Sequence, residues 1–110
     1  MDVKKVITAF YERVATDPMI GFYFRQSNIS RLIELECQLV ETLLDGKERY
    51  VGRPLAEVHA PFQIPGGHFD RRLTLLRETL AEHRVPFAVQ EKWIQHAQSL
   101  KALVVRRGCP

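Results

Sequence analysis

The chain has 110 residues, of which 45% are hydrophobic, so it is long enough for one domain with a buried core. The net charge of +3 is mildly basic, but acidic and basic residues alternate, and we interpret pairs such as Arg71–Arg72 as solvated surface rather than a nucleic-acid interface. No apolar run is long enough for a membrane span and no signal peptide is recognisable, so we expect a single cytoplasmic domain over residues 1–110 with no membrane partner.

The hydrophobic pattern of the first half is helical throughout. A first helix is expected over residues 2–15, and the Asp-Pro pair at 17–18 stops it and begins a short turn rich in aromatic residues. A long helix then begins at a cap that is either Asn28 or Ser30, and it reaches about residue 44.

The second half predicts three more helices. Pro54 opens a short one, a Gly-Gly pair at 66–67 leads into a longer one, and Val85-Pro86 separates that helix from a last one with inward residues from 89 to 104. No segment alternates with a period of two for long enough to form a strand. The fold class is therefore all-α, with five or six helices.

Two polar residues stand on apolar helix faces. Glu36 lies within the apolar stripe of its helix, where a carboxylate is costly unless it is protonated or hydrogen-bonded. It is either a structural group with a partner across the core or a polar group in a ligand cavity. His59 faces inward on the short helix, where a histidine is more often a core residue than a ligand, and His96 is interpreted as structural. His68 and His83 lie at helix ends and are interpreted in the same way.

Several segments in order resemble one family. These are FYERVATDPMIGFYF, SNISRL, YVGRPLAEVH followed by FQIPGGHFD, and RVP before the last helix. Together they resemble the truncated haemoglobins, the short two-over-two globins, and the group I branch best. The similarity extends from about residue 10 to 86, and more loosely to 105. It starts at the family's second helix, so we expect the first helix to be missing here.

The resemblance implies haem b (iron protoporphyrin IX) as cofactor, with His59 as the proximal iron ligand and His68 as a structural residue. It implies that the hydroxyl of Tyr11 points at the bound ligand, and that Glu36 occupies a position commonly held by glutamine. The other cofactor-binding residues that it implies are Phe10, Phe24, Leu32, Leu39, Val40, Ile64 and Phe69, with Arg31 and Tyr50 as partners of the haem propionates.

The resemblance implies a monomeric or homodimeric protein that binds or transports oxygen, or binds another diatomic gas such as nitric oxide. It assigns no catalytic residue, although nitric-oxide dioxygenation or peroxidase-like chemistry would be open to it with a reductase partner. The main alternative is a haem-free helical sensor or interaction module on a globin scaffold. A small basic nucleic-acid-binding protein is a weaker third alternative.

Overall fold

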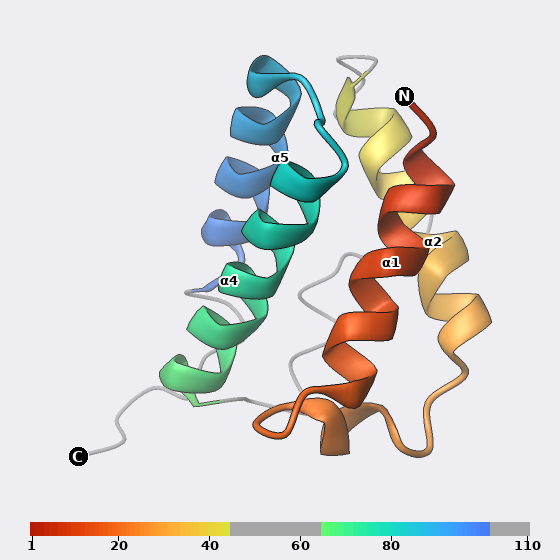
Figure 1. Cartoon of the computed structure of the whole chain (residues 1–110), viewed down its shortest axis with the longest axis vertical. Coiled ribbons are helices and arrows are strands. Elements are labelled where there is room, and N and C mark those ends of the chain that lie inside the picture. Colours follow the sequence, from red (N-terminus) through yellow and green to blue (C-terminus); the bar gives the residue numbers. More distant parts are fainter. Residues whose placement is uncertain (45–64, 102–110) are drawn as a thin grey trace.

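The computed structural model of the protein describes residues 1–44 and 65–101, and this part is helical (Figure 1). Its elements are α1 (Val3–Thr16), the short 3₁₀ helix η1 (Gly21–Phe24), α2 (Ile29–Leu44), α4 (Gly66–Glu82) and α5 (Phe87–Ser99). The described residues contain no strand, which confirms the all-α prediction. The short helix expected at Pro54 lies outside the described residues. The last helix is shorter than expected, because α5 ends at Ser99 with Leu100 as its C-cap instead of continuing to residue 104.

The helices form two pairs that face each other. α1 packs against α2, and α4 packs against α5; across the pairs, α1 contacts α4 and α2 contacts α5 (Figure 1). This arrangement is a two-over-two helical sandwich. None of the helices in the described part of the chain is long and apolar enough to cross a bilayer.

The helix starts follow local capping. The Asp2 carboxylate accepts a hydrogen bond from the backbone N–H of Lys5 at 3.1 Å, and this caps α1. At α2 the Asn28 side chain accepts from the backbone N–H of Arg31 at 3.1 Å. Asn28 is therefore the cap, which decides between the two residues that the sequence left open.

The turn after α1 is fixed by Asp17, whose side chain is only 3% exposed. One carboxylate oxygen accepts from the backbone N–H groups of Met19 and Ile20 at 2.9 and 3.1 Å. The other accepts from Nε and Nη2 of Arg71 at 3.0 and 2.7 Å. Asp17 therefore ties the turn that carries η1 to α4. The hydrogen bonds from Arg71 and from the turn hold the pKa of Asp17 below its ordinary value.

We expect Asp17→Asn to lower the midpoint of thermal unfolding by roughly 5–10 °C at pH 7. Because the folded-state pKa of Asp17 is lowered, its ionised carboxylate stabilises the fold above its ordinary pKa of 3.8, and this stabilisation is lost as the pH falls below that value. The difference in unfolding midpoint between this variant and the unmodified protein should therefore be smaller at pH 3 than at pH 7. Thermal unfolding followed by circular dichroism at both pH values checks this.

The matched control is Asp70→Asn, which removes an exposed carboxylate whose partner is Lys101 at 2.9 Å. An exposed ion pair contributes little, so this variant should unfold within about 3 °C of the unmodified protein. Equal losses in the two variants would contradict the role given to Asp17.

The connection between α4 and α5 confirms the break predicted at Val85-Pro86. α4 ends at Glu82 with His83 as its C-cap, and Arg84 adopts a left-handed φ of 52°. Pro86 then serves as the N-cap of α5. This tight connection returns α5 along α4, so that the buried Trp93 faces the other helix pair.

Candidate functional site

A cavity of about 420 Å³ lies between the two helix pairs. η1 and α2 form one side, α4 and α5 form the other, and Tyr11 reaches it from α1. Most of the lining side chains are aliphatic or aromatic, and a small number are polar. Both the volume and this composition are typical of sites that hold a cofactor or another small molecule.

Most of the residues that the sequence singled out meet at this cavity. Those that line it are Tyr11, Phe24, Arg31, Leu32, Glu36, Leu39, Val40 and Phe69. Phe10 is not among the lining residues, because its ring is fully buried and packs edge-on against Tyr11 with centroids 5.3 Å apart. The predicted ligand His59, together with Tyr50 and Ile64, lies outside the described residues.

Helical periodicity brings the α2 residues to the cavity. Glu36 lies four positions after Leu32, three before Leu39 and four before Val40. Residues at these spacings share one face of a helix. Within residues 1–44 and 65–101, no side chain or backbone group hydrogen-bonds to the Glu36 carboxylate or pairs with it. The structure therefore places Glu36 on the wall of a cavity, and no partner for it across the core is found among the described residues.

Tyr11 presents a protonated hydroxyl to the cavity. Its side chain is 5% exposed and packs edge-on against Phe24 with ring centroids 6.0 Å apart. Burial, and then the nearby Glu36 carboxylate, raises the pKa of Tyr11 to about 12, against the opposing effect of Arg72. The hydroxyl therefore keeps its proton throughout the physiological pH range and can donate a hydrogen bond.

Arg72 is a cavity residue that the sequence analysis missed. Its guanidinium carbon lies 4.9 Å from the centroid of the Phe10 ring, and its charge opposes the rise in the pKa of the nearby Tyr11 hydroxyl. The interpretation of Arg71–Arg72 as solvated surface is wrong for Arg72, which lines the cavity. The side chain of Arg71 is 37% exposed, but it also binds Asp17. Arg72 lies three positions after Phe69 on α4, and that spacing is the signal that would have placed it on the inner face.

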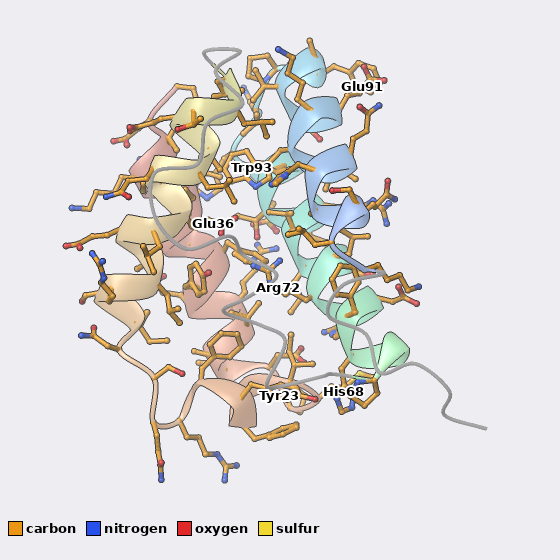
Figure 2. All side chains as sticks on the ribbon, turned by 180° about the vertical axis from the view of Figure 1, so that it is seen from behind. Tyr23, Glu36, His68, Arg72, Glu91 and Trp93 are labelled. Atoms are coloured by element: carbon orange, nitrogen blue, oxygen red, sulfur yellow. The ribbon has the colours of Figure 1, made fainter. Side chains whose placement is uncertain are left out.

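Figure 2 shows the side chains from behind, with Glu36, Arg72 and Trp93 between the helix pairs. Trp93 is 3% exposed, and its indole Nε1 has no hydrogen-bond partner among the described residues. The same holds for Nε2 of His96, which also lines the cavity. Two buried ring nitrogens therefore lack partners beside the same cavity.

His68 has the structural contacts that its position predicts. Its Nδ1 lies 2.7 Å from the hydroxyl oxygen of Tyr23, and the two rings meet edge-on with centroids 5.7 Å apart (Figure 2). Phe22 packs against the same imidazole at 5.9 Å. His68 thus joins η1 to the first turn of α4 and is one of the residues that line the cavity.

Comparison with known proteins gives a consistent result. A model of the bacterial-like globin family matches residues 1–106. A group 1 truncated haemoglobin of Tetrahymena thermophila is 29% identical over 69% of this chain and 63% of its own length. One of Tetrahymena pyriformis is 26% identical over 87% of this chain and 82% of its own length. The crystal structure of the Tetrahymena pyriformis truncated haemoglobin in its Fe(III) form superposes with a TM-score of 0.81, at 22% identity over 96% of this chain and 90% of that one.

Proposed function

The chain belongs to the bacterial-like globin family, and from this premise we propose that it binds haem b in the cavity between its two helix pairs and takes up a diatomic gas beside it. One observation carries the proposal. Eight of the residues that the family resemblance assigned to the haem site, from Tyr11 to Phe69, come from four separate elements and line one cavity.

The lining of this cavity fits haem. Phe24, Leu39 and Val40 offer apolar surface to a flat, largely apolar ring, and Arg31, whose side chain is 59% exposed, offers a cation at the solvent edge for a propionate. His59 would hold the iron. When bound, haem supplies an iron at which a diatomic ligand such as oxygen or nitric oxide coordinates.

The residues around that ligand have different roles in binding it. The Tyr11 hydroxyl keeps its proton at physiological pH and can donate it in a hydrogen bond to a ligand. Glu36, when ionised, can only accept, so it competes with the ligand for that proton. Leu39 and Val40 keep bulk water from the ligand, which strengthens the hydrogen bond that Tyr11 donates.

Titration of haemin into the haem-free chain tests this function. The proposal predicts a Soret band that grows until one haem is bound per chain, and a shift of that band when the reduced protein meets oxygen or carbon monoxide. A folded chain that develops no saturable Soret band would refute the proposal and favour the haem-free sensor or interaction module.

A further inference from the structure

The cavity contains a cation that the binding of a neutral gas does not require. Arg72 lines it, and a guanidinium stays charged at every physiological pH. Within the described part of the chain, no carboxylate lies within ion-pair distance of Arg72. Other cations do have such partners there: Arg13, Arg31, Arg71 and Lys101. Among the described residues, the charge of Arg72 is therefore neutralised by no carboxylate, and its guanidinium lies over the face of the Phe10 ring beside the cavity.

The polar groups around Arg72 are mainly hydrogen-bond donors. The indole Nε1–H of Trp93 can only donate, and among the described residues it finds no acceptor. The Tyr11 hydroxyl keeps its proton because its pKa is raised to about 12, so it can also donate. Glu36 is the one carboxylate among the described residues of the lining. Buried donors without partners are costly, so this cavity is suited to a ligand that supplies acceptor atoms.

We propose that Arg72 is the residue that sets ligand class in this pocket, and that it makes small inorganic anions preferred ligands beside the haem. This inference rests on the proposed haem-binding function. A hydrogen bond from a guanidinium to an anion is about twice as strong as one between neutral groups, and the mostly apolar lining weakens its screening. A neutral diatomic gas gains little from the same cation.

Other titratable groups face the same space. The Glu36 carboxylate opposes an anion, while the imidazoles of His68 and His96 also border the cavity. The Nδ1 of His68 is engaged with the Tyr23 hydroxyl, so this nitrogen is not available to an anion in the cavity. Removing the charge of Glu36 should therefore strengthen anion binding, and removing that of Arg72 should weaken it.

The test uses azide as the anion and nitric oxide as the neutral comparator, both titrated into the ferric, haem-loaded protein and followed by the Soret shift. Arg72→Leu should weaken azide binding about tenfold or more and change nitric oxide binding less than about threefold. Arg72→Lys should keep azide affinity within about threefold of the unmodified protein, because it retains the charge. Arg77→Leu, on the exposed side of α4, is the matched control and should change neither affinity.

Equal azide affinity in the unmodified protein and in Arg72→Leu, with the Soret band intact, would overturn the inference and leave the haem proposal standing. An equal loss of azide and nitric oxide affinity would also overturn it, because that pattern indicates general damage to the pocket. An unmodified protein without any Soret band would refute the proposed function and this inference together.

Discussion

His59→Ala should abolish stable haem binding, with a loss of affinity of more than about 100-fold. The substitution removes the only imidazole that follows the Gly-x-Pro-Leu segment at the spacing of the family's proximal ligand. Haemin titration of the variant, followed by the Soret absorbance of the ferrous form, measures the loss.

The structure supplies two controls for this prediction. His68→Ala removes an imidazole that contacts Tyr23, so it should lower stability and leave haem binding in place. His96→Ala removes the other described histidine of the cavity lining, whose Nε2 has no partner among the described residues. A normal ferrous spectrum in His59→Ala, together with its loss in His96→Ala, would show that the iron ligand lies on α5.

Tyr11→Phe should increase the rate of oxygen dissociation about tenfold. The phenyl ring keeps the edge-on packing against Phe10 and Phe24, so the variant loses little besides the hydroxyl. That hydroxyl is a protonated donor at neutral pH because its pKa is raised to about 12. Stopped-flow measurement of the dissociation rate checks the expectation.

Tyr23→Phe is the matched control, since Tyr23 also lines the cavity but its hydroxyl is engaged by His68. Its dissociation rate should stay within about twofold of the unmodified protein, because a hydroxyl in a fixed contact elsewhere does not stabilise the ligand. An unchanged rate in Tyr11→Phe would mean that Tyr11 donates its proton to Glu36 instead of the ligand.

Local sequence signals predicted the framework of the site well. Helical spacing placed Leu32, Glu36 and Leu39 on one face of α2, and that face lines the cavity. The Asp-Pro pair marked the end of α1, and the side chain of Asp17 does cap the following turn. These features depend on neighbours within a few positions, which is the range over which a periodic pattern carries information.

The features that the sequence did not predict depend on distant partners. Arg71 meets an Asp17 that is 54 positions away, and Arg72 meets Tyr11 on another helix. When the residues packed against a helix are unknown, two adjacent basic residues on it are most simply interpreted as exposed to solvent. Trp93 was expected to face inward, and it does, but only the packing of α5 against α2 shows that its indole nitrogen borders a cavity.

The central claim is that the cavity between the helix pairs is the haem pocket, and blocking it tests the claim most directly. Ala97→Trp places a large ring in the cavity from α5, while Ala88→Trp adds the same ring on the exposed side of that helix. Both variants should keep the circular dichroism of the unmodified protein. We expect haemin affinity to fall about tenfold or more in Ala97→Trp and to stay unchanged in Ala88→Trp. Equal affinities in the two folded variants would contradict the assignment of haem to this cavity.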